Sequence, residues 1–103
     1  MLLRCQDIFG QEINLSEKQW EHIISEHPEA EPYLDEVAEV LKAPQYIKRS
    51  KSDSAVWLYY RFYERVYSGK YLLVVVKRAE PSFVITFYVT DRIKTGETLW
   101  PKR

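Results

Sequence analysis

The spacing of hydrophobic residues predicts two helices in the first half of the chain. A helix that starts after Ser16, a good N-cap residue, would end near His27, because Pro28 pushes the residue before it out of helical conformation. Its apolar face carries Trp20, Ile23, Ile24 and His27 at helical spacing. A second helix is expected from about Pro32 to Pro44, with a buried stripe of Leu34, Val37, Ala38 and Leu41.

The second half carries the pattern of β-strands. Runs rich in β-branched and aromatic residues predict strands at 46–48, 56–63, 71–78, 83–90 and 98–100. Residues 2–5 and 12–15 predict a hairpin ahead of the helices, and the strand at 71–78 is apolar enough to lie at the centre of the sheet. This order predicts an α+β fold: an N-terminal hairpin, two helices, then an antiparallel sheet of four or slightly more strands, in one domain over residues 1–103.

Alternation along the strands predicts one apolar and one polar face of the sheet. In the last long strand we expect Phe83, Ile85, Phe87 and Val89 to face the helices, and Val84, Thr86, Tyr88 and Thr90 to face the other way. Arg61, Lys77, Thr86 and Tyr88 would form a polar face of aromatic, hydroxyl and cationic groups, which suits RNA. Tyr60 joins this face only if its strand is bulged. The alternative is that the tyrosines are ordinary half-buried strand residues.

Two histidines are the candidates for proton transfer. His22 and His27 are five residues apart, about 140° around a helix, so they do not form a zinc-binding pair. His27 shares the face of Trp20 and can act as acid or base near neutral pH, although a plain helix-capping role is the alternative. His22 lies off that face, beside Glu26, in the pattern of a surface residue. Cys5 has only Arg4 as a basic neighbour and is interpreted as a strand residue.

Composition and charge narrow the class of protein. The chain of 103 residues is 46% hydrophobic with one cysteine, which excludes a disulfide framework and makes a cytosolic setting the default. No apolar run reaches the roughly 20 residues of a membrane-spanning helix, and the first residues lack the pattern of a signal peptide. The formal charge of zero divides into −7 over residues 1–45 and +7 over 46–103. Either one surface attracts a polyanion, or the charges simply pair within the fold.

An ordered series of short motifs runs along nearly the whole chain and resembles a known group of proteins. The series is Asp7-x-Phe9-Gly10, Leu15-Ser16, Trp20-x-His22-Ile23, His27-Pro28-Glu29, Pro44, Tyr59-Tyr60-Arg61, Val74-Val75-Val76-Lys77, Phe83-Val84-Ile85-Thr86-x-Tyr88-x-Thr90, Gly96 and Leu99-Trp100. It resembles the phage and bacterial nuclease-like domains of the barnase–EndoU–colicin–RelE superfamily. That resemblance implies an α+β fold, metal-independent cleavage of RNA such as tRNA or mRNA without a cofactor, and a toxin with an antitoxin or immunity partner.

The resemblance and the residues together lead to a specific hypothesis. His27 or His22 would take a proton from an RNA 2′-hydroxyl, and a 2′,3′-cyclic phosphate would form. Lys77 and Arg61 would stabilise charge on the phosphoryl oxygens, Thr86 and Tyr88 would donate hydrogen bonds or relay a proton, and Tyr60 would stack on a base. The alternative is a non-catalytic domain of the same fold that binds a protein or RNA. A small-molecule enzyme has no cofactor motif to support it, and the oligomeric state is left open.

Overall fold

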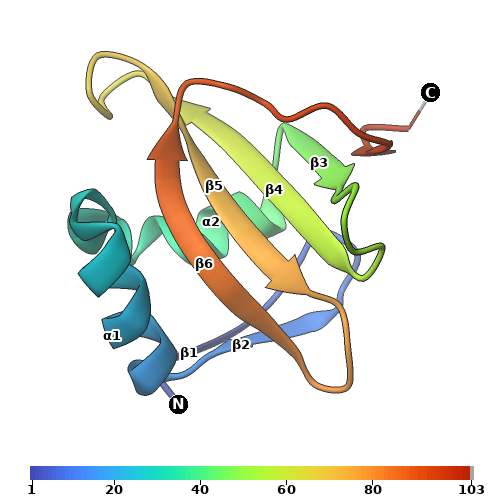
Figure 1. The fold of residues 1–103 in the computed structure, drawn as a ribbon, viewed down its shortest axis with the longest axis horizontal. Helices are drawn as coiled ribbons and strands as arrows, with labels where there is room; N and C mark the ends of the chain where they lie inside the picture. The colour runs from blue at the N-terminus through green and yellow to red at the C-terminus, as the bar shows by residue number, and fades with distance from the viewer. Residues whose placement is uncertain (103) are drawn as a thin grey trace.

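The computed structural model of the protein describes residues 1–102 and has the expected order of elements (Figure 1). The strands and the first helix begin and end close to the predicted positions, and the second helix does not. They are β1 (Leu3–Gln6), β2 (Glu12–Leu15), α1 (Glu17–Glu26), the 3₁₀ helix η1 (Pro28–Tyr33), α2 (Glu36–Lys42), β3 (Tyr46–Arg49), β4 (Val56–Tyr63), β5 (Lys70–Lys77), β6 (Ser82–Thr90) and β7 (Thr98–Trp100).

The strands form one sheet of seven, in the order β1-β2-β6-β5-β4-β3-β7. The most apolar strand, β5, lies in the middle, as expected. The predicted number of about four antiparallel strands is wrong. The N-terminal hairpin adds β1 and β2 to one edge, where β2 pairs parallel to β6 through Ile13–Ser82 and Asn14–Phe83, and β7 adds to the other edge against β3. The fold is therefore α+β with a mixed sheet.

Two prolines decide how the chain continues after α1. Ser16 accepts a hydrogen bond from the Gln19 N–H and caps the helix as predicted. The second helix does not start at Pro32, however. Pro28 and Pro32 cannot donate backbone hydrogen bonds, so the segment between His27 and Leu34 forms η1, and the α-helix begins only at Glu36. This short turn holds the end of α1 next to β6.

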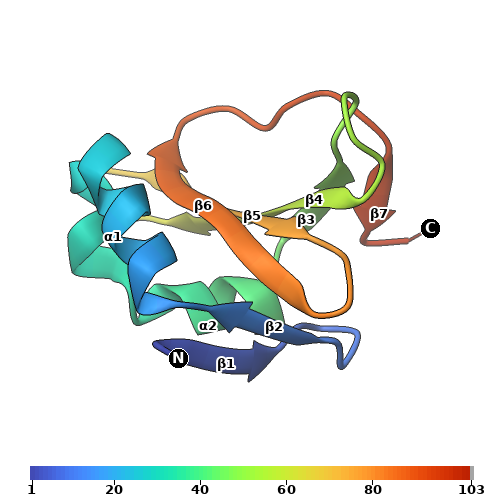
Figure 2. The ribbon, with the colours of Figure 1, turned by 60° about the horizontal axis from the view of Figure 1, so that its bottom comes forward.

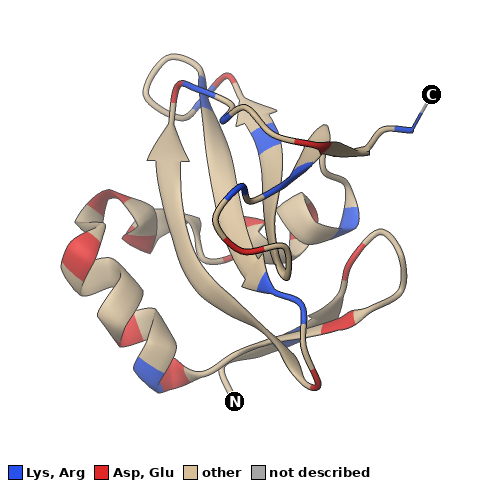
Figure 3. Cartoon of the chain, turned by 45° about the vertical axis from the view of Figure 1, so that its right-hand side comes forward, with Lys and Arg blue, Asp and Glu red and all other residues tan. Residues whose placement is uncertain are grey.

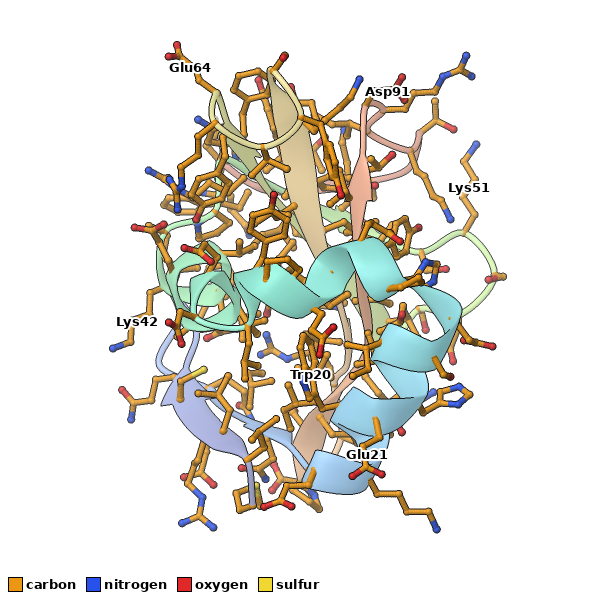
Figure 4. All side chains as sticks on the ribbon, turned by 90° about the vertical axis from the view of Figure 1, so that its left-hand side faces the viewer. Trp20, Glu21, Lys42, Lys51, Glu64 and Asp91 are labelled. Carbon is orange, nitrogen blue, oxygen red and sulfur yellow. The ribbon has the colours of Figure 1, made fainter. Side chains whose placement is uncertain are left out.

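The sheet has two different faces (Figure 2). The helix face packs on α1, α2 and the N-terminal hairpin and holds the main core, where Trp20 of α1 lies against Phe87 of β6 with ring centroids 6.2 Å apart (Figure 4). The loop face is the opposite one, above which the 91–97 segment runs on its way to β7. Its smaller apolar cluster consists of Leu58, Tyr60, Leu73 and Val75, with Tyr88 and Ile93 packed against it.

A bulge in β6 changes which residues reach each face. Val76 pairs with Val84 but its neighbour Val75 pairs with Thr86, so Ile85 is an extra residue in β6. Val84 consequently lies in the helix-face core, whereas Ile85 packs with the loop-face cluster and Phe83 is 43% exposed. The prediction that Phe83 and Ile85 face the helices is wrong, and the prediction for Phe87 is confirmed.

A buried ion pair ties the N-terminal hairpin to the sheet. The Asp7 side chain is fully buried; its Oδ1 accepts hydrogen bonds from the N–H groups of Phe9 and Gln11, each 2.9 Å long. Its Oδ2 accepts from the hydroxyl of Tyr59 and from Arg78 Nη1, the latter at 2.8 Å. The Arg78 guanidinium in turn lies 3.9 Å from the ring centroid of Trp57, a cation–π contact.

Within the described residues, none of the helices combines the length and apolarity needed to cross a membrane.

Candidate active site

His27 lies where α1 ends and the edge of the sheet begins. As the C-cap residue it donates its backbone N–H to the Ile23 carbonyl oxygen. Its imidazole stacks on the ring of Tyr88 in β6, with centroids 4.7 Å apart and planes inclined by 20°. The side chain is still 32% exposed, and its Nδ1 lies 3.6 Å from Glu29 Oε2 in η1. His27 is thus held by an aromatic ring on one side and has a carboxylate near its Nδ1, while about a third of its side chain stays exposed.

His22 is in a different environment. Its side chain is 59% exposed, and its Nε2 lies 3.3 Å from Glu26 Oε1, one helical turn further along α1. The five-residue spacing turns the two imidazoles away from each other, as the helical period requires. The structure therefore places His27 on the sheet and His22 on the outer side of the helix.

Tyr88 belongs to a row of side chains that crosses the loop face. Leu73 in β5 pairs with Tyr88 on one side and with Tyr60 in β4 on the other. The hydroxyl of Tyr60, a fully buried residue, accepts a 3.0 Å hydrogen bond from the Lys94 N–H. Burial raises the pKa of Tyr60, and the bond from Lys94 acts weakly in the opposite direction. Tyr60 thus lies on the loop face although β4 pairs with β5 without a bulge. The expectation that its ring stacks on a base is wrong, because the residue is fully buried.

Arg61 is on the other side of the sheet. It pairs with Leu72, a residue of the helix-face core, and its Nη1 donates a 2.7 Å hydrogen bond to the Ala43 carbonyl oxygen after α2. The prediction that Arg61 shares a face with Lys77, Thr86 and Tyr88 is wrong. Strand alternation allows only one of two neighbouring residues on a face, and that residue is Tyr60.

Lys77 lies on the loop face but at the far end of β5. It stands four residues beyond Leu73, about 13 Å along the strand from the row that holds Tyr88. Its Nζ donates a 2.6 Å hydrogen bond to Asp53 Oδ2, and this bond, helped by one from the Ala55 N–H, lowers the pKa of Asp53. Thr86 lies between Lys77 and Tyr88, and its hydroxyl is buried with no partner among residues 1–102. The structure thus brings His27 together with Tyr88 but separates both from Lys77.

Sequence reasoning missed two neighbours of the candidate site. Glu29 enters the sequence-based expectations only within the motif His27-Pro28-Glu29, without a role, although the prolines around it fold it back beside His27. Lys94 is not among the expected residues, yet its backbone N–H holds the Tyr60 hydroxyl. No local pattern in the sequence signals a contact of this backbone group.

The described part of the chain, residues 1–102, holds no group of three or more histidine, cysteine, aspartate or glutamate side chains arranged to bind a metal ion. Cys5 lies in β1, as its interpretation as a strand residue predicts, and burial raises the pKa of its thiol.

Comparison with known proteins bears on what such a site does. A search of curated proteins and a search of solved structures each found no match to this chain. A family model described as "phage-Barnase-EndoU-ColicinE5/D-RelE like nuclease2" matches residues 3–101. This match covers nearly all of the chain, from β1 to the end of β7, and agrees with the resemblance seen in the motifs. The chain belongs to this family of nuclease-like proteins.

Proposed function

We propose that this protein is an endoribonuclease in which His27 accepts the proton of an RNA 2′-hydroxyl. The observation that carries the proposal is the stacking of His27 on Tyr88 at the rim of the loop face, with a third of the imidazole open to solvent. Membership of a nuclease-like family supports nucleic acid as the substrate.

The proposed reaction needs no group beyond the chain and the RNA. The 2′-hydroxyl proton moves to His27 Nε2 while the 2′-oxygen forms a bond to the adjacent phosphorus. The bond from phosphorus to the 5′-oxygen of the next nucleotide then breaks, and that oxygen takes up a proton. The products are a 2′,3′-cyclic phosphate and a free 5′-hydroxyl. Glu29, beside Nδ1, would stabilise the imidazolium, and the Tyr88 hydroxyl would donate to a phosphoryl oxygen.

The geometry changes the roles expected for the remaining candidates. Lys77, about 13 Å from the row of Tyr88 and already paired with Asp53, would contact a different phosphate from the one that reacts. Thr86, which lies between Lys77 and Tyr88, would have a structural role in the part of the loop face on which the RNA lies. His22, 59% exposed on the outer side of α1, has no role in this mechanism. Arg61, on the helix face, has none either.

The test compares His27→Ala with His22→Ala on RNA and on DNA of the same sequence, in the presence of EDTA. A positioned general base contributes about 10²–10⁴-fold, so His27→Ala should lose that factor while His22→Ala keeps the wild-type rate. The product should carry a 2′,3′-cyclic phosphate, and DNA, which lacks the 2′-hydroxyl, should remain intact. Equal cleavage of DNA, or an unchanged rate for His27→Ala, would refute the proposal.

One observation favours a second function, a domain that binds RNA or protein without cutting. Lys77 pairs with Asp53 and lies at the far end of β5 from the row of Tyr88, on which His27 stacks, so the cation expected to stabilise the phosphoryl oxygens is not beside the imidazole. In that case the wild-type protein would bind RNA in the same assay and leave it whole.

A toxin role in the cytosol and an antitoxin partner belong to the same proposal. They predict that expression of the wild-type chain slows bacterial growth and that His27→Ala relieves the effect. Growth inhibition that persists in the His27→Ala strain would dissociate toxicity from this site.

A further inference from the structure

A cationic hollow lies on the loop face next to the candidate site. Three cations line it: Lys51 from the β3–β4 connection, and Arg92 and Lys94 from the segment that follows β6. Its volume is about 520 Å³, within the range of ligand-binding pockets. Leu58 and Ile93 are also part of its lining and belong to the loop-face cluster, so the hollow has an apolar base with cations around it.

The three cations are not neutralised within the fold. Three acids come near them in the chain: Asp53 pairs with Lys77, Glu97 pairs with Arg49 at 2.9 Å, and Asp91, next to Arg92, forms no ion pair within residues 1–102. None of the three cations forms an ion pair with any residue between 1 and 102. Two serine hydroxyls at the hollow, Ser50 and Ser52, lie 3.1 Å apart and add hydrogen-bonding groups suited to an anion.

The distribution of charge over the rest of the molecule also favours an anion at the loop face. Most acids of the first half lie on α1, η1 and α2, whereas most basic positions lie on the strands and loops of the second half (Figure 3). Lys42 of α2 and Lys51 extend from opposite sides of the molecule (Figure 4). A polyanion is therefore attracted to the loop face and repelled from the helices.

The hollow is connected to the candidate site by the residues that pack between them. The Lys94 N–H holds the Tyr60 hydroxyl, and Tyr60 shares its row with Tyr88, on which His27 stacks. Leu58 lies two residues from Tyr60 on the same face of β4, about 12 Å from Tyr88 by strand spacing and rise. Because Tyr60 and Leu73 are buried between the two places, a chain that passes His27 would reach the hollow over the 91–97 segment, since β6 ends two residues after Tyr88 and this segment carries Arg92 and Lys94.

We propose that Lys51, Arg92 and Lys94 bind the phosphates of a single-stranded RNA that flank the nucleotide at His27. This inference rests on the proposed function, because it assumes that the same RNA occupies both places. Sites for single strands contain a cationic groove that follows the phosphates, and the hollow supplies such cations. An acidic protein partner is the competing occupant.

The experiment measures binding separately from cleavage. A fluorescein-labelled oligonucleotide with 2′-O-methyl groups throughout has no free nucleophile, and its anisotropy reports binding at several salt concentrations. Three phosphate contacts on a single strand predict a slope of about −2 for the logarithm of the binding constant against the logarithm of salt. Lys51→Ala, Arg92→Ala and Lys94→Ala should each reduce the size of that slope by about 0.7.

Lys42→Ala is the matched control, since Lys42 is exposed on the acidic side of the molecule. It should keep the wild-type slope. The Lys94→Ala protein retains the backbone N–H that bonds to Tyr60, so a loss of binding in it reports the ammonium and not the fold. Equal slopes for all four variants would overturn the inference, and so would a poly-glutamate peptide that competes as well as RNA.

The outcomes also separate this inference from the proposed function. If the protein cleaves RNA but the Lys51, Arg92 and Lys94 variants bind RNA like wild type, the proposed phosphate site is refuted and the proposed nuclease activity stands. If RNA binding depends on the three cations but the protein does not cleave RNA, the proposed nuclease activity is refuted and the hollow remains a site for RNA.

Discussion

The exchange of one buried carboxyl for an amide, Asp7→Asn, tests how the N-terminal hairpin is held. Asp7 is the only counter-charge that Arg78 contacts within the described residues, and its side chain is fully buried. The substitution keeps the shape and removes the charge, so that an amide N–H₂ or an unpaired oxygen faces Arg78 and the Tyr59 hydroxyl. The expected result is a large loss of stability without a change of fold.

The size of that loss follows from the geometry. Breaking a buried ion pair by removing one partner costs about 3–5 kcal/mol, because the other charge remains buried and uncompensated. The Arg78 side chain is 20% exposed and still lies on Trp57, so water and the ring offset part of the cost. We therefore expect the lower end, about 3 kcal/mol. For a domain of this size that lowers Tm by about 12 °C or more.

Urea unfolding followed by far-UV circular dichroism measures the difference in the free energy of unfolding between Asp7→Asn and wild type. The slope of that free energy against urea concentration should be the same for both proteins. Glu97→Gln is the control, since it makes the same chemical change in an exposed pair with Arg49 and should cost about 0.5 kcal/mol. If Asp7→Asn lies within about 1 kcal/mol of wild type, the reasoning about the buried pair is refuted.

Further expectations concern pH, backbone strain and the thiol. Burial and the bond to Asp7 raise the pKa of Tyr59, so the folded chain keeps a proton there that the unfolded chain loses above pH ~10. This one group should lower stability by about 1.4 kcal/mol per pH unit in that range, and Tyr59→Phe should reduce the slope of a pH series of urea titrations by that amount, while Tyr63, whose pKa is also raised, keeps its own contribution. Gly96→Ala places a Cβ 2.7 Å from the Arg49 carbonyl oxygen at φ +153°, so it should lower Tm more than Gly10→Ala, which meets open space at φ +84°; equal shifts would contradict this. Because burial raises the pKa of Cys5, iodoacetamide at neutral pH should alkylate the folded protein far more slowly than the protein in urea.

The elements could be predicted from sequence because their signals are local. Ser16, Pro28 and the alternating strands mark their own boundaries, and the uninterrupted apolar run of β5 identified the central strand. The size of the sheet could not be predicted in this way. The parallel pairing of Ile13 with Ser82 joins segments about seventy residues apart, and no local pattern encodes it.

The candidate site was predictable in part for the same reason. Helical spacing placed His27 on the inner face of α1, where it meets Tyr88. Lys77 was grouped with these residues because strand alternation gives the face of a residue but not its position along the strand. The bulge at Ile85 then shifted the register of β6, which changes the faces of Phe83 and Val84.

The parallel contact between β2 and β6 also affects how the chain is synthesised. The N-terminal hairpin is made first, but the strand against which it docks ends only at Thr90, and β7 follows still later. Such long-range pairing requires the closure of large loops and makes folding slow. A ribosome that has released only the helices and β3 therefore carries no assembled sheet, and neither the stacked imidazole nor the loop face exists until β6 has been released.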